Sequence, residues 1–138
     1  MKNKNKKEHL LFVDDDSITN YLHEFILTKQ INYKGNIHFC INGRESLEYL
    51  RDLIDKEIAD TKFPSLIFLD INMPELDGFG FIEAYQLLPK KVTESTAIII
   101  LTSSLNESDR EKAFTYPMVK NYLVKPLNAS TISKILGK

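Results

Sequence analysis

The chain has 138 residues, of which 43% are hydrophobic and 27% are charged, and its formal net charge is −1. This length suits one domain with a sizeable core and is too short for two domains of ordinary size. The balanced charge gives no electrostatic reason to expect nucleic-acid binding. No apolar run is long enough to span a membrane, and the N-terminus lacks the apolar segment of a signal peptide.

The start of the chain differs from the rest, because residues 1–8 combine several lysines with few apolar side chains. We expect a disordered basic tail there, followed by a single domain over residues 9–138. Cys40 is the only cysteine, so no disulfide can form within the chain, and its apolar surroundings suit a core position. These features fit a cytoplasmic protein, a monomer or weak homodimer, with no nucleic-acid or membrane partner.

Five short apolar runs bounded by turn residues predict five buried strands. They span residues 9–13, 37–41, 66–69, 97–101 and 120–124. Each run is followed by a segment in which apolar residues recur at helical spacing, which predicts five helices. The apolar positions of these segments are, in chain order, Ile18, Leu22, Phe25 and Ile26; Leu47, Leu50 and Ile54; Phe81, Tyr85 and Leu88; Ala113 and Phe114; and Ile132, Ile135 and Leu136.

Polar residues with capping character precede three of these helices. Ser17 is expected to cap the first helix and Asn128 the last. The fourth helix, over residues 106–115, has two candidate caps, Ser104 and Ser108, each with a glutamate three residues later. Its apolar face is thin, so this helix buries little surface and should be the most easily shifted element.

The alternation of strands and helices predicts an α/β fold in which helices cover both faces of a parallel sheet. We expect the flavodoxin-like, doubly wound arrangement, with a five-stranded parallel sheet of strand order 2-1-3-4-5 and five helices. In such a sheet, ligands bind at the carboxyl ends of the strands, near the switch point between strands one and three.

The most informative pattern is the set of polar residues just past the predicted strands. The first strand is followed by Asp14, Asp15 and Asp16, the second by Asn42 and Gly43, the third by Asp70, the fourth by Thr102 and the fifth by Lys125. The second strand, which delivers no charged side chain, is an edge strand in the expected order. The reactive residues therefore converge on one crevice beside the switch point.

The carboxylates of this crevice predict a metal site, because clustered carboxylates repel one another and need a cation. Hard oxygen ligands with room left for water suit Mg²⁺. We expect Asp15 and Asp70 to bind it directly and Asp14 to bind it through water. The backbone carbonyl of Asn72 could supply a further ligand. Asp16 is more often a residue that starts a helix, so it is left out of this set.

The same residues predict phosphoryl chemistry. With a cation in place, the Asp70 carboxylate can attack a phosphorus atom as a nucleophile. The transferring group carries spread negative charge, which the cation and Lys125 would neutralise. The hydroxyl of Thr102 could donate a hydrogen bond to a phosphoryl oxygen. Asp70 is therefore predicted to be a phosphoryl acceptor.

Four segments carry these residues. They are Phe12-Val13-Asp14-Asp15-Asp16, Asp70-Ile71-Asn72-Met73-Pro74 with Asp77-Gly78, Ile100-Leu101-Thr102-Ser103, and Tyr122-Leu123-Val124-Lys125-Pro126. In this order and at these separations they resemble the receiver domain of two-component response regulators. The match covers nearly the whole chain and no effector segment follows the last predicted helix, so the resemblance is to a stand-alone, chemotaxis-regulator-like receiver.

The resemblance implies a signalling role. Asp70 would take a phosphoryl group from a phosphohistidine on a sensor histidine kinase or a histidine phosphotransfer protein. Asp14 and Asp15 would form the acidic Mg²⁺ pair, while Thr102 and Lys125 would contact the phosphoryl group. The Lys125–Pro126 peptide bond would be cis, as is usual in that family. Such a protein is not an enzyme in the ordinary sense, since at most it catalyses its own phosphorylation and dephosphorylation.

The resemblance also implies a conformational switch, because Tyr122 matches the position of the family's switch aromatic. Thr102 would move toward the phosphoryl group and Tyr122 would turn inward behind it. The face made by the fourth helix, the fifth strand and the fifth helix would then change. The approach to this aromatic departs from the family, which often has Gly or a small residue pair a few positions before it, whereas this chain has Tyr116-Pro117-Met118-Val119-Lys120-Asn121.

Two other functions compete with this one. A haloacid-dehalogenase-type phosphatase would use Asp14 as nucleophile and Asp16 as general acid. It would also require an acidic pair after the fourth strand, where Thr102 stands, and it leaves Asp70 unexplained. A non-phosphorylated pseudo-receiver would act only as a binding module, but such proteins typically lack the acceptor aspartate or the lysine, and Asp70 and Lys125 are both present.

Overall fold

The structure, a computed structural model, describes residues 9–56, 63–103 and 106–137. The predicted tail over residues 1–8 and the candidate cap Ser104 lie outside these ranges. The strands are β1 (His9–Val13), β2 (Asn36–Cys40), β3 (Leu66–Asp70), β4 (Ala97–Thr102) and β5 (Val119–Val124). They pair in parallel in the order β2-β1-β3-β4-β5, which confirms the predicted flavodoxin-like sheet.

Within the described residues, the five expected helices are present together with two further helical turns. The helices are α1 (Ser17–Phe25), which continues as the π-helical turn η1 (Ile26–Gln30), α2 (Gly43–Asp55), α4 (Gly78–Tyr85), α5 (Lys90–Thr93), α6 (Glu107–Ala113) and α7 (Ala129–Leu136). The one-turn α5 begins after Pro89, which fits the tolerance of a helix start for proline. None of the helices among the described residues is long and apolar enough to cross a membrane.

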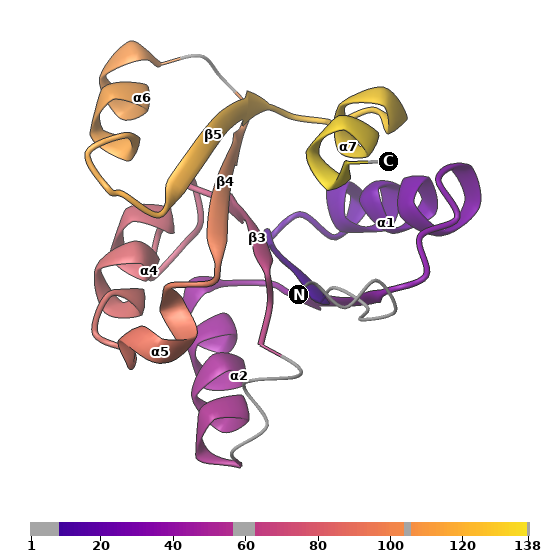
Figure 1. The fold of residues 1–138 in the computed structure, drawn as a ribbon. Helices are drawn as coiled ribbons and strands as arrows, with labels where there is room; N and C mark the ends of the chain where they lie inside the picture. The colour runs from indigo at the N-terminus through magenta and orange to yellow at the C-terminus, as the bar shows by residue number, and fades with distance from the viewer. Residues whose placement is uncertain (1–8, 57–62, 104–105, 138) are drawn as a thin grey trace.

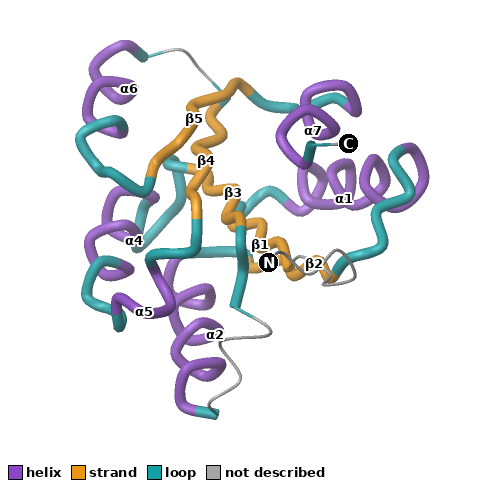
Figure 2. The backbone as a smooth tube through the Cα atoms, viewed as in Figure 1, coloured by secondary structure: helices purple, strands orange, loops and turns teal. Residues whose placement is uncertain are grey.

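The helices form two layers, one on each face of the sheet. Figures 1 and 2 show α1 and α7 on one face and α2, α4, α5 and α6 on the other. Side chains alternate along each strand, so β1 contributes Leu11 and Val13 to the core under α2 and α4, and Leu10 and Phe12 to the core under α1 and α7. Because both faces are covered, the central strands β1, β3 and β4 are apolar except at their ends.

The buried face of α1 differs from the prediction. Of the four apolar positions expected in the core, only Ile26 is buried, whereas Ile18 is 77% exposed. The helix instead turns Asn20, His23 and Leu27 toward the sheet. This orientation is possible because Asn20 and His23 each form a side-chain hydrogen bond with a backbone group of a neighbouring loop, so one polar atom of each side chain is paired inside the protein.

Two of the predicted helix caps are wrong, and one is confirmed. Asp16, not Ser17, caps α1, because its carboxylate accepts hydrogen bonds from the amides of the first turn. Asn106, not Ser108, caps α6 in the same way. Asn128 caps α7, as predicted, with its side-chain oxygen 2.8 Å from the Thr131 nitrogen. In both errors an Asp or Asn near the predicted serine provides the capping oxygen, and both residue types cap at least as well as serine.

Gly78 lets α4 begin directly against the end of β3. A Cβ atom at this position would lie 2.6 Å from the Cα of Ile71 and 2.8 Å from the carbonyl oxygen of Asp70, distances too short for any side chain. The Gly78 amide donates a hydrogen bond to the Ile71 carbonyl at 3.1 Å. The turn formed by Asp77 and Gly78 thus holds the backbone that follows β3, and with it the position of Asp70.

Candidate functional site

The carboxyl ends of β1 and β3 bring three carboxylates together. One oxygen atom each of Asp14, Asp15 and Asp70 lies within 4.8 Å of the others. Asp14 and Asp70 are buried, each 3% exposed, while Asp15 is exposed. This is the grouping that the sequence predicts, and it follows from parallel strands that end at one edge of the sheet.

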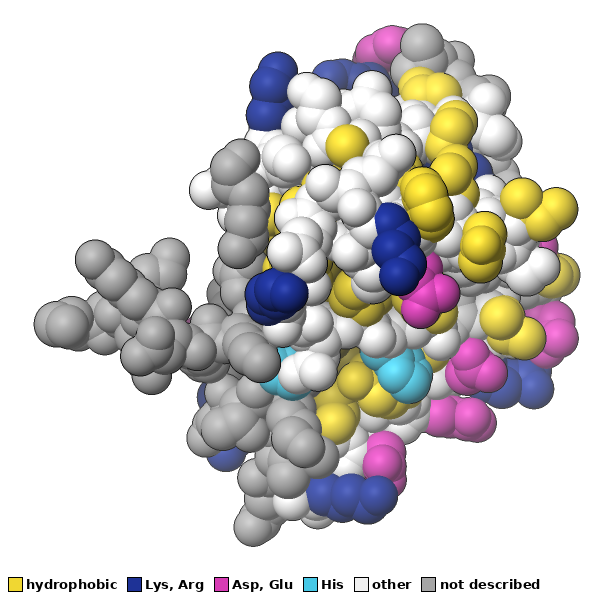
Figure 3. Space-filling model, turned by 90° about the vertical axis from the view of Figure 1, so that its right-hand side faces the viewer, with side chains coloured by type: hydrophobic (Ala, Val, Ile, Leu, Met, Phe, Trp, Pro, Cys, Tyr) yellow, Lys and Arg dark blue, Asp and Glu magenta, His cyan; other side chains and the backbone are white. Residues whose placement is uncertain are grey.

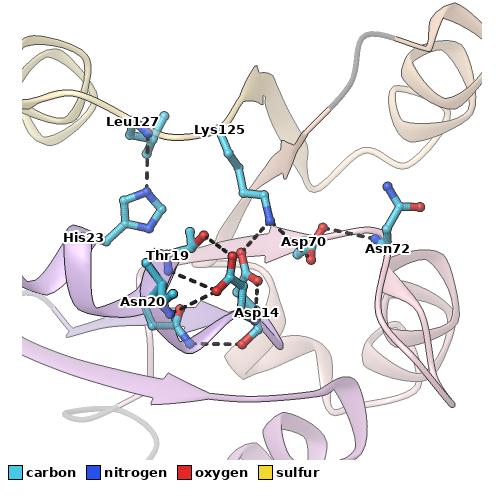
Figure 4. A network of polar contacts seen from close by, with 10 residues as sticks. Asp14, Thr19, Asn20, His23, Asp70, Asn72, Lys125 and Leu127 are labelled. Atoms are coloured by element: carbon cyan, nitrogen blue, oxygen red, sulfur yellow. Dashed lines mark hydrogen bonds and ion pairs between the residues drawn. The ribbon is translucent and has the colours of Figure 1, made fainter.

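Lys125, just past β5, reaches into this cluster. Its Nζ atom lies 3.0 Å from Asp14 Oδ2 and 3.5 Å from Asp70 Oδ2, between the two buried carboxylates (Figure 4). Burial by itself would lower the pKa of Lys125, but the hydrogen bonds and charges of the two carboxylates together raise it. The lysine is therefore a charged ammonium at neutral pH. Its backbone amide also donates to the Thr102 carbonyl at 2.8 Å, which ties β5 to the end of β4.

Asp70 is held in a position where its charge is costly. The Asn72 amide donates to Asp70 Oδ1 at 3.1 Å. Burial is the main cause that raises the pKa of Asp70 to about 6, and the charges of Asp14 and Asp15 act in the same direction. The Asn72 amide and the Lys125 ammonium oppose this shift but do not cancel it. At pH 7 Asp70 is mostly ionised, yet its proton is held more tightly than that of an ordinary aspartate.

Hydrogen bonds fix both the carboxylate and the backbone carbonyl of Asp14. The amide of Asp16 donates to Asp14 Oδ1 at 2.9 Å, and the side-chain nitrogen of Asn20 donates to the Asp14 carbonyl at 3.0 Å (Figure 4). Asp16 itself points elsewhere, since its exposed carboxylate accepts from the Thr19 hydroxyl at 2.9 Å and from the amides of the first turn of α1. Asp16 therefore acts as a helix cap outside the carboxylate cluster.

The cluster has the composition of a divalent-cation site. Three carboxylates share one close ammonium, so the group keeps an excess of negative charge. Hard carboxylate oxygens with one open side suit Mg²⁺, which binds through few carboxylates and keeps several waters. The Asn72 side chain is exposed at the rim of this site.

A cavity of about 480 Å³ opens over the cluster. Its polar lining includes Asp15, Asp70 and Lys125, and its apolar lining includes Ile18 and Leu22 of α1. These two apolar residues were predicted to lie in the core, and they form a wall of the cavity instead. The exposed side of α1 is therefore one border of the opening that leads to Asp70.

Thr102 and Tyr122 lie behind the cluster. Thr102 ends β4 and is buried, and Tyr122 is 6% exposed in β5, paired in register with Ile100 of β4. Burial is the main cause that raises the pKa of Tyr122, while the neighbouring Thr102 hydroxyl acts to lower it. Tyr122 thus has an inward side chain next to Thr102.

The sequence comparison agrees with this geometry. A model of the response regulator receiver domain matches residues 10–137. The chain belongs to this family. The two-component response regulator ARR22 of Arabidopsis thaliana is 32% identical over 134 residues, which cover 97% of this chain and 84% of that protein.

Solved structures of receiver domains have the same fold. A two-component response regulator from Cytophaga hutchinsonii superposes with a TM-score of 0.84 at 27% identity, covering 96% of each chain. A phosphorylated cyanobacterial phytochrome response regulator, RcpA, gives a TM-score of 0.72 at 25% identity, and the match covers 94% of this chain and 89% of that chain.

Membership of the receiver family argues against the phosphatase alternative. In that alternative Asp16 would be the general acid, but here Asp16 caps α1. The Lys125–Pro126 bond is cis, as the resemblance implied.

Two polar residues of this receiver domain were missed by the sequence reasoning. Asn20 holds the Asp14 backbone, and the Nε2 atom of the buried His23 accepts a hydrogen bond from the Leu127 amide at 3.4 Å. A signal for them was present, since positions 20, 23 and 27 form a helical face as regular as the apolar one. Hydrophobicity alone therefore indicates the wrong face of α1 as the one that packs on the sheet.

We predict that Asp70→Asn stabilises the protein when divalent cations are removed. Because the folded state holds the Asp70 proton more tightly than the unfolded chain, it binds more protons between about pH 4 and pH 6, and stability falls as the pH rises through that window. Asparagine avoids this loss, so the variant should be more stable by roughly 1–3 kcal/mol at pH 7 and no more stable at pH 4. Urea unfolding in EDTA at both pH values measures this.

The control is Asp55→Asn, at an exposed position at the end of α2. It should change stability little at either pH. A loss of stability for Asp70→Asn at pH 7 would contradict the cause assigned to its raised pKa.

Proposed function

We propose that this chain is a phosphoacceptor of a two-component signalling system and that Asp70 takes the phosphoryl group. The observation that carries this proposal is the position of Asp70, buried between an ammonium and two other carboxylates at the floor of an open cavity. The pseudo-receiver alternative does not account for this position, because a pure binding module has no need for a costly buried charge. The related phytochrome regulator, whose structure was solved in a phosphorylated form, supports the same role.

The transfer is a substitution at phosphorus. An Asp70 oxygen forms a bond to the phosphorus atom of a phosphohistidine while the phosphorus–nitrogen bond breaks. The electron pair of the broken bond stays on the imidazole nitrogen, which takes a proton from solvent. The product is an aspartyl phosphate. Asp70 must be ionised to attack, which its pKa of about 6 permits at neutral pH.

The remaining residues hold and neutralise the transferring group. Lys125 lies within reach of Asp70 and places a positive charge where phosphoryl oxygens would lie. Thr102, at the end of the neighbouring strand, would donate a hydrogen bond from its hydroxyl to one of these oxygens. The Asn72 amide keeps one oxygen of Asp70 fixed, so the other oxygen is directed to the attack.

The acidic residues fit a bound Mg²⁺. Asp15 and Asp70 would ligate it directly, Asp14 through water, and Asn72 through its backbone carbonyl. Such an ion, when bound, offsets the negative charge of the transferring phosphoryl group. The chain contributes the pre-arranged carboxylates, two of which are buried and held by backbone hydrogen bonds.

The donor is proposed to be a protein that carries phosphohistidine, either a sensor histidine kinase or a phosphotransfer protein. Beside the cavity, α1 exposes a row of apolar side chains at helical spacing. They are Ile18, Tyr21, Leu22 and Phe25, which are 77%, 69%, 37% and 42% exposed. Figure 3 shows hydrophobic side chains gathered on the side of the molecule that presents α1 and α7. An apolar helix row next to a reactive group suits a partner helix that bears the phosphohistidine.

The output is proposed to be a change in the face formed by α6, β5 and α7. α6 buries one residue, Ala113, and its other contacts lie at the surface. Lys112 Nζ lies 4.4 Å from the ring centre of Phe79 in α4, and the Tyr116 hydroxyl donates to Glu83 Oε2 at 2.6 Å. Surface contacts of this kind contribute little each, so movement of Thr102 toward a phosphoryl group, followed by the Tyr122 side chain that already lies inward beside it, would suffice to shift α6.

The first prediction concerns the acceptor. Incubation with Mg²⁺ and either acetyl phosphate or phosphoramidate should add one acid-labile phosphoryl group, measured as a mass increase of the intact protein. Asp70→Asn should abolish this addition, and Asp14→Asn should weaken it through loss of a metal ligand. Asp55→Asn should react like the wild type. Full labelling of Asp70→Asn would contradict the proposal, and an unlabelled wild type would favour the pseudo-receiver.

The second prediction concerns the donor surface. Tyr21→Asp and Phe25→Asp should slow transfer from a phosphorylated histidine phosphotransfer domain by roughly tenfold or more, because each places a charge in an apolar interface. Their rates with acetyl phosphate should stay within about twofold of the wild type, because neither residue lines the cavity. Leu87→Asp is the matched control, since Leu87 is 86% exposed on another part of the surface. Equal transfer rates for all three variants would contradict the docking surface.

The third prediction concerns the switch. Beryllofluoride with Mg²⁺, used as a phosphoryl mimic, should shift the amide resonances of residues 102–125 far more than those of β2 and α2. Amide exchange in α6 should change as well, because Ala113 is the one buried residue of this helix. Asp70→Asn, treated in the same way, should show neither change. Identical spectra over residues 102–125 with and without the mimic would exclude this switch.

A further inference from the structure

His23 is a buried polar residue that the proposed transfer does not use. Its side chain is fully buried on the inner side of α1, and its ring lies 5.3 Å from that of Phe12. Burial lowers the pKa of His23 to about 4, so the ring is neutral at pH 7. The Nε2 atom accepts a hydrogen bond from the Leu127 amide at 3.4 Å (Figure 4), which assigns the proton of the neutral ring to Nδ1.

The core packing does not by itself explain a histidine here. Nδ1 is buried and has no hydrogen-bond partner among the described residues. A buried polar atom without a partner destabilises a fold. Leucine would avoid that cost in a site that is apolar around Phe12. The feature that leucine could not reproduce is the acceptor for the Leu127 amide.

The Leu127 amide belongs to the segment that delivers Lys125 to the carboxylates. The Lys125 amide is bound to the Thr102 carbonyl at 2.8 Å, so the segment is tied to the sheet at its first residue. Pro126 has no amide hydrogen to offer. The Leu127 amide is therefore the next donor along the chain, and it binds α1 through His23. The segment from Lys125 to Leu127 is thus anchored at both ends, to β4 at Lys125 and to α1 at Leu127.

The same helix also holds the partner of Lys125. Asn20, one turn before His23, donates to the Asp14 carbonyl at 3.0 Å. Asp14 and Lys125 form the ion pair of 3.0 Å at the centre of the site. The inner side of α1 therefore fixes both members of this pair, Asp14 through Asn20 and Lys125 through His23.

We propose that His23 is a positioning residue for Lys125, acting through the Leu127 amide. The inference rests on the proposed phosphoacceptor function, because it assigns His23 to the placement of the ammonium that neutralises the transferring phosphoryl group. Metal binding and phosphoryl binding should respond differently to a change at His23. The proposed Mg²⁺ ligands lie at the ends of β1 and β3, whereas His23 binds the segment after β5. Loss of the His23 acceptor should weaken phosphoryl binding and transfer and leave metal binding intact.

The experiment compares His23→Leu with His23→Gln. Glutamine can place a side-chain oxygen near the position of Nε2 and accept from Leu127, whereas leucine cannot accept. His23→Leu should slow phosphorylation by phosphoramidate roughly tenfold to a hundredfold, the range expected for a misplaced charged group. It should weaken beryllofluoride binding in parallel, while its Mg²⁺ affinity by calorimetry stays within about twofold of the wild type. His23→Gln should recover most of both losses. The matched control is His38→Leu, because His38 lies on β2 and stacks on Tyr49, away from this segment.

Three outcomes would overturn the inference. They are a wild-type rate for His23→Leu, equal losses for the leucine and glutamine variants, and a loss of Mg²⁺ affinity that parallels the loss of phosphorylation.

If the variants fail to fold, a measurement on the wild-type protein still tests the anchor. The nitrogen–nitrogen scalar coupling across the hydrogen bond from the Leu127 amide to His23 Nε2 should be detectable by NMR, and its absence would refute the anchor. An unphosphorylated wild type would refute the proposed function instead, and the coupling would still report on the anchor.

Discussion

The mutual repulsion of three clustered carboxylates, offset by one ammonium, is the constraint on which the rest of this structure depends. Asp14 and Asp70 are almost fully buried, and the pKa of Asp70 rises to about 6 because burial and its acidic neighbours oppose its ionisation. The fold holds these groups together by placing them at the carboxyl ends of three parallel strands, β1, β3 and β5, which hydrogen bonds join to neighbouring strands of one sheet. In the free state, the carboxylates of this site repel one another. A bound cation, alone or together with a phosphoryl group, reduces this repulsion, and the reduction favours binding.

This constraint explains the unusual orientation of α1. A helix with apolar residues at positions 18, 22 and 25 would normally turn them inward, yet here they remain at the surface. The inward positions carry Asn20 and His23, whose side chains bind backbone groups at Asp14 and Leu127. The helix therefore gives up part of its possible core contact in order to fix two loops of the site. The exposed apolar row that results is adjacent to the cavity, where a partner protein can bury it.

The fold and most of the site could be predicted from the sequence, because both follow from strong local signals. Apolar runs marked the strands, and a parallel sheet brings the residues after those strands to one edge, which placed Asp14, Asp70 and Lys125 together. The errors have a common origin in choices between near-equal local alternatives. Asp16 competes with the adjacent Ser17 as a cap, and two helical faces of α1 are equally regular. One contact that favours the observed face of α1 joins residues more than a hundred positions apart, His23 and Leu127, and periodicity does not reveal such a contact.

The helix α6 and the turn that follows it are attached to α4 mainly through surface contacts. The Tyr116 hydroxyl binds Glu83 of α4, and Lys112 lies over Phe79, so α6 and the turn after it are fastened to α4 by polar and cation–π contacts. Contacts of this kind at a surface are worth on the order of 1 kcal/mol each, well below the cost of disrupting an apolar core. A helix fastened in this way can move without unfolding the domain. Tyr116 and Lys112 thus give α6 and the turn after it a defined position against α4 that depends on surface contacts and not on a large apolar core.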